Sequence, residues 1–296
     1  MSEHPATIAG ATSSTVTSSR TGRIVVACML PLMLAASALR AQSGTTPGAK
    51  YVEKIPGTLI TFEMLPVPGG SVTLETAAGP RTVQVAPFWM ARTETTWDLY
   101  DVYVYGFDRS APRMPGEEAV SRPTRPYVLP GDAFGHDGLP ALGMSFQAAN
   151  AFAHWVSVRT GRTYRVPTEA QWEHACRLGA QSTADTAARS WARENAEQRT
   201  HEVASKPADA FGLHDVLGNV AEWVAGVDGD SVAKGGAYNM AASEMSCSSR
   251  MRQTAAWNET DPQLPKSRWW LPDATFLGVR LIRVPDDSTA RGTRRP

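Results

Sequence analysis

Residues 211–223 read FGLHDVLGNVAEW, and this stretch contributes most to the fold assignment. Taken alone, its Gly218-Asn219 pair is typical of a tight turn, and Glu222 is typical of a surface charge. Three further segments accompany it: RVPTEAQWE at 165–173, KGGAY at 234–238 and GVRL at 278–281. Each segment is a weak signal by itself, whereas the four in this order and at this spacing are specific. We therefore interpret them together.

Helical patterns lie upstream of this stretch. Ser145 is placed to cap a helix whose apolar face runs to Val156, and Gly161 ends that helix. A second helix begins after Thr168, which has the capping-box spacing to Gln171. The apolar spacing over 95–104 predicts a shorter helix, with Thr95 as its cap, and helical periodicity fades beyond residue 180.

Short strands and long loops are predicted for most of the remaining chain. Residues 59–85 are short apolar stretches broken by Pro and Gly, residues 87–90 resemble a buried strand, and residues 231–234 a further short strand. Residues 106–140 hold many Pro and Gly residues and predict a surface loop. The pattern predicts one α+β domain of few helices around short strands, with low regular secondary structure.

The composition limits the classes of partner. The chain has 296 residues, with 29 Lys and Arg against 29 Asp and Glu, so its formal net charge is zero. Nucleic acids attract proteins through uncompensated basic residues, so no nucleic-acid partner is expected. The hydrophobic fraction of 42% is sufficient for a packed core.

The first 41 residues are predicted to be a signal peptide. Arg20 and Arg23 precede an apolar run over 24–39, which contains Pro31 and is shorter than the roughly 20 residues that span a bilayer. A retained membrane anchor is the alternative. With cleavage near Ala41 we expect an exported protein, periplasmic or secreted, with no membrane span afterwards. We expect a linker over 42–58, the domain over 59–284 and a disordered tail over 285–296.

Common catalytic motifs are missing from the sequence. There is no P-loop, no GxGxxG, no HExxH and no GxSxG, and the six histidines have no zinc-ligand spacing. Trp257, Trp269 and Trp270 lie in one late region of the chain. They are candidates for a ligand-facing aromatic surface, although tryptophans in loop-rich folds more often close a core.

The four segments together resemble the formylglycine-generating enzyme (sulfatase-modifying factor) family, over roughly residues 62–283. The resemblance implies a C-type-lectin-like fold. It also implies a calcium site in the 211–223 segment, with Asp215, Gly218, Val220 and Glu222 as ligands, because calcium takes carboxylate and carbonyl oxygens. It further implies a disulfide between Cys176 and Cys247, the two cysteines that remain after signal cleavage.

The catalytic cysteine pair of that family is absent. Its two copper(I)-binding cysteines correspond to Met240 and to Ala242 or Met245, depending on a short gap. The serine expected after Gly-Gly is Ala237, and only Arg250 matches the family pocket. A methionine pair could bind copper(I) through its thioethers, but methionine is a common core residue, so copper is not expected and calcium is.

These observations favour a non-catalytic, exported binding or accessory domain, a pseudoenzyme. Its candidate ligand surface comprises Arg250, Trp257, Trp269 and Trp270, and its partner would be a peptide, a glycan or an envelope protein. The alternative is a formylglycine-generating-type oxidase that matures sulfatases, or a related oxidoreductase on the same scaffold. A calcium-stabilised envelope structural protein is a third hypothesis.

Overall fold

The computed structural model describes residues 47–126, 130–180 and 183–285. The predicted signal peptide and residues 286–296 of the predicted tail lie outside the described residues. In the described part, no helix combines the length and the apolar character needed to cross a membrane.

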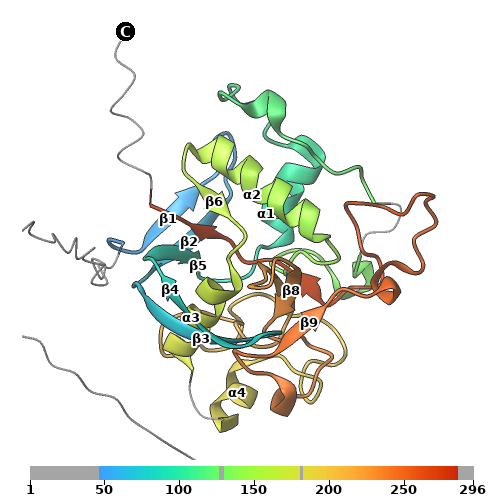
Figure 1. Cartoon of the computed structure of the whole chain (residues 1–296). Coiled ribbons are helices and arrows are strands. Elements are labelled where there is room, and N and C mark those ends of the chain that lie inside the picture. The colour runs from blue at the N-terminus through green and yellow to red at the C-terminus, as the bar shows by residue number, and fades with distance from the viewer. Residues whose placement is uncertain (1–46, 127–129, 181–182, 286–296) are drawn as a thin grey trace, which may run out of the picture. The chain divides into compact units, whose positions relative to one another are not determined.

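A five-stranded antiparallel sheet joins the start of the domain to its end (Figure 1). Its order is β1 (Tyr51–Lys54), β2 (Thr61–Val67), β5 (Phe88–Ala91), β11 (Ile282–Arg283) and β6 (Tyr164–Arg165). The last strand of the chain therefore lies between β5 and β6.

Strand β1 corrects the expected linker over 42–58. Its single buried side chain is Glu53, whose carboxylate accepts hydrogen bonds from Arg162 and from the Tyr164 hydroxyl. Because the inward-facing residue is charged, the segment shows no apolar alternation, and the sequence pattern predicted no strand there.

A four-stranded sheet and a hairpin complete the strands. The sheet has the order β10 (Leu277–Gly278), β7 (Ala221–Ala225), β8 (Ser231–Lys234) and β9 (Arg250–Arg252), and β10 pairs with β7 in parallel. The hairpin consists of β3 (Gly70–Thr76) and β4 (Gly79–Val85) and packs against helix α3 (Glu169–Gly179). Helix α3 also contacts β7, so it connects the hairpin with the second sheet.

The two main helices begin where the capping residues predicted. The hydroxyl of Ser145 accepts the N–H of Ala148 at 3.1 Å at the start of α2 (Phe146–Thr160), and Gly161 ends the helix with a φ of 68°. In α3, Thr168 and Gln171 form both bonds of the capping box, at 3.2 and 3.1 Å.

The shorter helices differ more from the prediction. Helix α1 (Trp97–Asp101) begins one residue later than expected, after Thr96 instead of Thr95. Thr96 makes no side-chain cap bond. The helix continues as the π-helical η1 (Val102–Gly106). Helix α4 (Thr183–Arg189) lies where periodicity had faded. Within the described residues, four short 3-10 turns interrupt the loops: η2 (Glu117–Ala119), η3 (Asp132–Phe134), η4 (Ala242–Glu244) and η5 (Ala255–Asn258).

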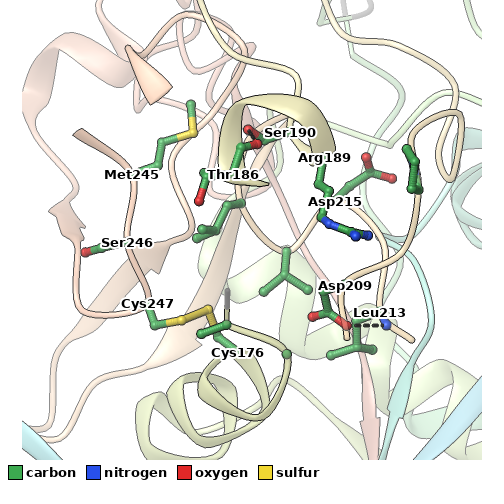
Figure 2. A pocket seen from close by; sticks show the side chains of 15 residues that line it. Cys176, Thr186, Arg189, Ser190, Asp209, Leu213, Asp215, Met245, Ser246 and Cys247 are labelled. Atoms are coloured by element: carbon green, nitrogen blue, oxygen red, sulfur yellow. Dashed lines mark hydrogen bonds between the residues drawn. A yellow bond between two sulfur atoms is a disulfide. The ribbon is translucent and has the colours of Figure 1, made fainter. Parts of the chain in front are cut away.

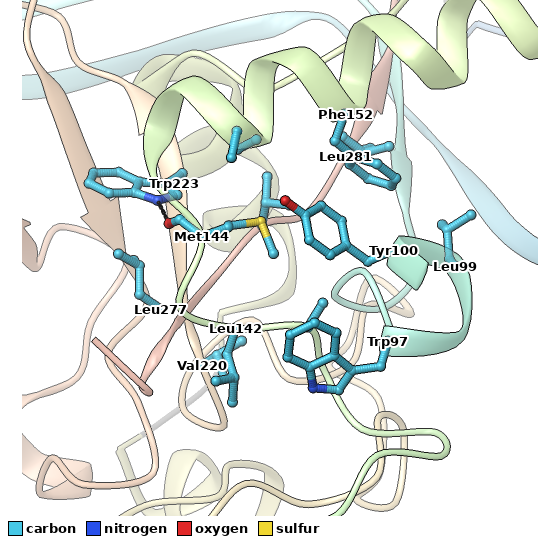
Figure 3. Close-up of a cluster of buried hydrophobic side chains, with 14 of the residues drawn as sticks. Trp97, Leu99, Tyr100, Leu142, Met144, Phe152, Val220, Trp223, Leu277 and Leu281 are labelled. Carbon is cyan, nitrogen blue, oxygen red and sulfur yellow. Dashed lines mark hydrogen bonds between the residues drawn. The ribbon is translucent and has the colours of Figure 1, made fainter. Parts of the chain in front are cut away.

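Aromatic side chains fill the core between α1, α2 and the second sheet (Figure 3). Tyr100 packs edge-on against Phe152 and Trp270, with ring centroids 5.1 and 6.0 Å apart. The indole N–H of the fully buried Trp223 donates to the carbonyl of Met144 at 2.9 Å. Buried indoles thus obtain hydrogen bonds as well as packing.

The late tryptophans belong to this core, which corrects their assignment to a ligand surface. Trp269 and Trp270 are only 6% and 3% exposed, and the Trp270 indole N–H donates to the carbonyl of Thr124. Trp257 is partly buried and packs against Trp223. Their apolar area is used in folding, so Trp269 and Trp270 present no aromatic platform to a ligand.

We predict that Thr168→Ala lowers the free energy of unfolding by about 1 kcal/mol, because it removes the side-chain acceptor of the α3 capping box. Urea unfolding followed by tryptophan fluorescence measures the change. Thr254→Ala is the matched control, since Thr254 precedes η5 without a side-chain cap bond. Equal losses in the two variants would contradict this role of Thr168.

Candidate functional site

A fully buried ion pair joins Glu222, near the end of the 211–223 segment, to Arg280. The Arg280 guanidinium donates to the Glu222 carboxylate from Nη2 at 2.7 Å and from Nε at 2.9 Å. The Trp172 indole N–H of α3 donates to the other carboxylate oxygen at 2.7 Å. Arg280 also donates to the carbonyls of Ala91 and His214. Every charged atom of the pair is therefore compensated within the protein.

This pair bears directly on the expected calcium ligands. Both Glu222 oxygens accept bonds from Arg280 and Trp172, and one Asp215 oxygen accepts the N–H of Ala204 at 2.7 Å. In the part of the chain that is described, no three His, Cys, Asp or Glu side chains are grouped to hold a metal. Asp215, Gly218, Val220 and Glu222 thus do not fit calcium as a set, because Arg280 already supplies the positive charge at Glu222.

Two further carboxylates are buried near the pair. Glu94 and Asp215 are 2% and 3% exposed, and each has one oxygen without a hydrogen-bond partner among the described residues. Burial raises the pKa of Glu94 well above its usual range, and the nearby Asp215 charge raises it further. Burial likewise raises the pKa of Asp215 to about 6, against the lowering effect of the Ala204 N–H and of Arg280. The sequence pattern gave no indication of Glu94.

The segment after Gly235-Gly236 is the one in which the family resemblance led us to expect a cysteine pair. Gly236 has a φ of 74°, and a Cβ there would lie 2.7 Å from Met245 Cγ and 3.6 Å from Met240 Sδ. Both methionines thus pack towards this glycine, and Met245 is buried. A thioether has no proton to lose, so neither side chain can supply a thiolate.

The predicted disulfide is confirmed. Cys176 of α3 and Cys247 are bonded, with their Cα atoms 5.7 Å apart. The bond ties the segment after η4 to α3 across 71 residues of chain. Both cysteines of the described region are therefore oxidised.

A cavity of about 200 Å³ lies beside the disulfide (Figure 2). Its walls come from the end of α3, helix α4, the loop before β7 and the segment that contains Met245. The lining is mostly apolar, and a few polar side chains of both charges converge on it. Small-molecule sites commonly have this composition. The polar and sulfur-bearing side chains of the lining are Thr186, Arg189, Ser190, Asp209, Asp215, Met245, Ser246, Cys176 and Cys247.

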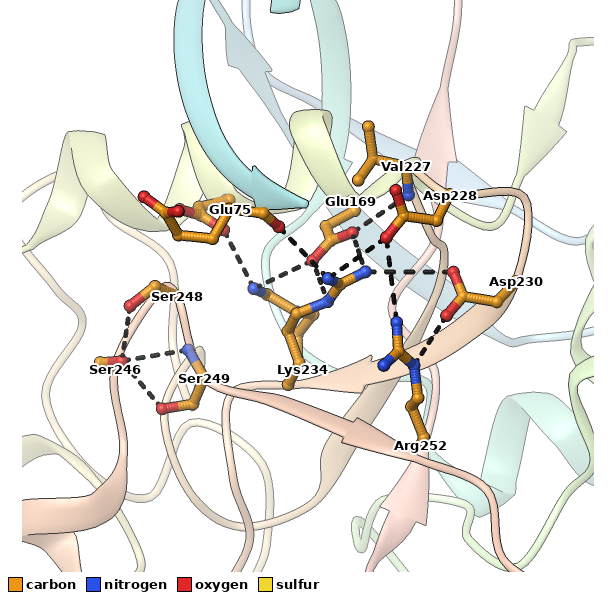
Figure 4. A network of polar contacts seen from close by, with 12 residues as sticks. Glu75, Glu169, Val227, Asp228, Asp230, Lys234, Ser246, Ser248, Ser249 and Arg252 are labelled. Carbon is orange, nitrogen blue, oxygen red and sulfur yellow. Dashed lines mark hydrogen bonds and ion pairs between the residues drawn. The ribbon is translucent and has the colours of Figure 1, made fainter. Parts of the chain in front are cut away.

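Arg250 lies in a separate ion network. Figure 4 labels Glu169, Asp228 and Lys234 of this network. Its guanidinium contacts Glu169 at 2.8 and 3.0 Å and Asp228 at 3.7 Å. The fully buried Lys234 pairs with Glu169 and Glu173 in the same network. The expected ligand role of Arg250 is therefore corrected, because its guanidinium is already paired with carboxylates of the same domain.

We predict a pH effect of the buried Asp215. Its folded-state pKa of about 6 lies above the ordinary 3.8, so the fold favours the neutral form, and stability falls as pH rises through this interval. Asp215→Asn keeps an acceptor for Ala204 and removes the charge. Its free energy of unfolding relative to wild type should rise between pH 4 and pH 6, by about 2 to 3 kcal/mol at most.

Chemical denaturation at several pH values, in calcium-free buffer, measures this difference. Asp137→Asn is the control, because the Asp137 side chain is fully exposed. A pH-independent difference for Asp215→Asn would contradict the assignment.

Comparisons with known proteins agree with this structure. The family model described as the sulfatase-modifying factor enzyme 1-like domain matches residues 52–261. The formylglycine-generating enzyme of Mycobacterium tuberculosis is 31% identical over 116 residues, covering 33% of this chain and 37% of that enzyme. The formylglycine-generating enzyme of Thermomonospora curvata is 28% identical over 166 residues, covering 48% of this chain and 43% of that enzyme.

A third relative has a different name. The serine/threonine-protein kinase pkn1 of Chlamydia caviae is 33% identical over 87 residues, covering 28% of this chain and 13% of the kinase. This chain thus spans less than half the length of each of these curated relatives.

Two solved structures share the fold. Treponema denticola variable protein 1 has a TM-score of 0.58 at 18% identity, covering 80% of this chain and all of that one. PvdO from Pseudomonas aeruginosa has a TM-score of 0.54 at 21% identity, and the match covers 79% of this chain and 100% of that one. At these identities the likeness concerns the fold alone. The family model matches well over half of the chain, and we conclude that the chain belongs to the sulfatase-modifying factor enzyme 1-like family.

Proposed function

We propose that this chain is an exported family member that has lost the thiol-dependent oxidase chemistry and acts as a binding or accessory protein. Its partner would be a peptide, a glycan or an envelope protein. The observation that carries the proposal is the state of the cysteines. The sequence has three, at positions 28, 176 and 247, and the last two form a disulfide.

The chemistry of the replaced positions supports this proposal. A cysteine acts as a metal ligand or a nucleophile as its thiolate, and the copper(I)-binding cysteine pair of the family requires that form. Met240 and Met245 cannot form a thiolate, and Ala237 offers no hydroxyl after the glycine pair. What remains beside this segment is a preformed cavity with few polar groups, which suits binding.

The export component of the proposal rests on the N-terminal segment. Its apolar run is short and follows two arginines, as in secretory signals. A disulfide in the folded domain also agrees with an oxidising compartment.

A formylglycine-generating-type oxidase remains the second candidate, and one observation favours it. Met240 and Met245 both approach Gly236, and thioether sulfur is a soft donor of the kind that copper(I) accepts.

The test uses the full chain expressed in a host that exports it. We expect no maleimide labelling of the denatured, unreduced mature protein, no stoichiometric copper, and no conversion of a Cys-x-Pro-x-Arg peptide to its aldehyde. Mass spectrometry of the peptide measures the conversion, with the Mycobacterium tuberculosis enzyme as the positive control. Conversion by this chain, abolished in Met240→Leu or Met245→Leu, would overturn the proposal in favour of the oxidase.

A further inference from the structure

The wall of the cavity beside the disulfide is apolar on one side. Met245 lines this side and is at least nine-tenths buried, and the Cys176–Cys247 disulfide lies on the same side. Leu213 and Val216 also line the cavity and are equally buried. At about 200 Å³ the cavity is smaller than typical pockets for drug-sized ligands, which begin near roughly 300 Å³. These dimensions suit a single small molecule with an apolar part.

A carboxylate with a free oxygen lies at the other side. Asp209 Oδ1 accepts the backbone N–H groups of Phe211, Gly212 and Leu213 at 2.8 to 2.9 Å, which fixes its orientation. No described residue donates a hydrogen bond to Oδ2. A side chain at Gly179 would overlap Oδ2, so the glycine at the end of α3 makes room for this oxygen.

A cation lines the same cavity. Arg189, the last residue of α4, donates from Nη1 to the carbonyl of Ala208. Among the side chains that the structure describes, no carboxylate lies within ion-pair distance of Arg189. In the view of Figure 2, Arg189 and Asp209 lie on one side of the cavity, and Met245 and the disulfide lie on the other.

We propose that this cavity binds a free apolar α-amino acid. Arg189 pairs with its carboxylate, Asp209 Oδ2 accepts from its ammonium group, and its side chain packs against Met245 and the disulfide. This inference rests on the proposed binding role and adds a small-molecule ligand to the macromolecular partner proposed above.

The chemistry of the lining selects this class. A guanidinium binds a carboxylate through two parallel hydrogen bonds, which gives orientation as well as affinity. Burial raises the pKa of Asp209, and an ammonium ligand would offset that cost of holding the charge. A glycan would leave the apolar wall without a matching surface. A ligand with one charge would pair with Arg189 or with Asp209 but not with both.

Isothermal titration of the full exported chain with L-leucine and L-phenylalanine tests the proposal. We expect binding that weakens by about tenfold or more in Arg189→Gln and in Asp209→Asn, since each loses a charged hydrogen bond. Asparagine keeps the oxygen that holds the 209–213 loop, and thermal melting checks that both variants fold. Arg199→Gln, at a half-exposed arginine outside the cavity, should bind as wild type does.

Three analogues of leucine separate the contribution of the ligand's carboxylate from that of its ammonium group. N-acetyl-L-leucinamide lacks both charges, 4-methylpentanoate keeps the carboxylate, and isoamylamine keeps the ammonium group. All three should bind at least about tenfold more weakly than leucine. Equal binding of N-acetyl-L-leucinamide, unchanged affinity in both variants, or no binding of either amino acid would overturn the proposal. If the aldehyde assay is also negative in that case, the ligand assignment fails while the non-catalytic role stands.

Discussion

The contact between Glu222 and Arg280 is the constraint on which the rest of the domain depends. Both side chains are fully buried, and a charge in such a place is tolerated only when its partners are complete. The completion involves four separate parts of the chain: the strand that carries Glu222, the Trp172 indole of α3, the carbonyl of Ala91 at the end of β5, and the carbonyl of His214. Satisfying one ion pair thus fixes how the two sheets and helix α3 meet.

The same constraint shapes the candidate site. Glu222 pairs with Arg280, whereas the buried Glu94 and Asp215 each have one oxygen without a hydrogen-bond partner among the described residues. Burial raises the pKa of both carboxyl groups. Beside them, the disulfide holds the segment after the glycine pair against α3, and Met240 and Met245 approach Gly236 in that segment. The chain has the fold of its family, and the proposal that it lacks the thiol chemistry rests on the residues of this segment.

The sequence predicted the parts of the fold that depend on local signals. The caps at Ser145 and Thr168 act through bonds within three residues, and the disulfide followed from the family resemblance. Features set by long-range burial were missed. Strand β1 buries a glutamate whose carboxylate accepts hydrogen bonds from the distant Arg162 and Tyr164 side chains. Trp270 packs against Tyr100 and donates to the carbonyl of Thr124, and both partners are more than a hundred residues away in sequence. Of the site, Glu94, Arg189 and Asp209 depend on tertiary contacts that no local pattern encodes.

A double-mutant cycle on Glu222→Gln and Arg280→Met tests the central claim most directly, with free energies of unfolding from urea denaturation at pH 7. Each single variant should lose about 3 to 5 kcal/mol, because it leaves one buried group without its partner. The double variant should lose less than the sum of the two, with a coupling energy of about 2 kcal/mol or more. Single losses that add to within about 0.5 kcal/mol would contradict the account, because the two side chains would then act independently.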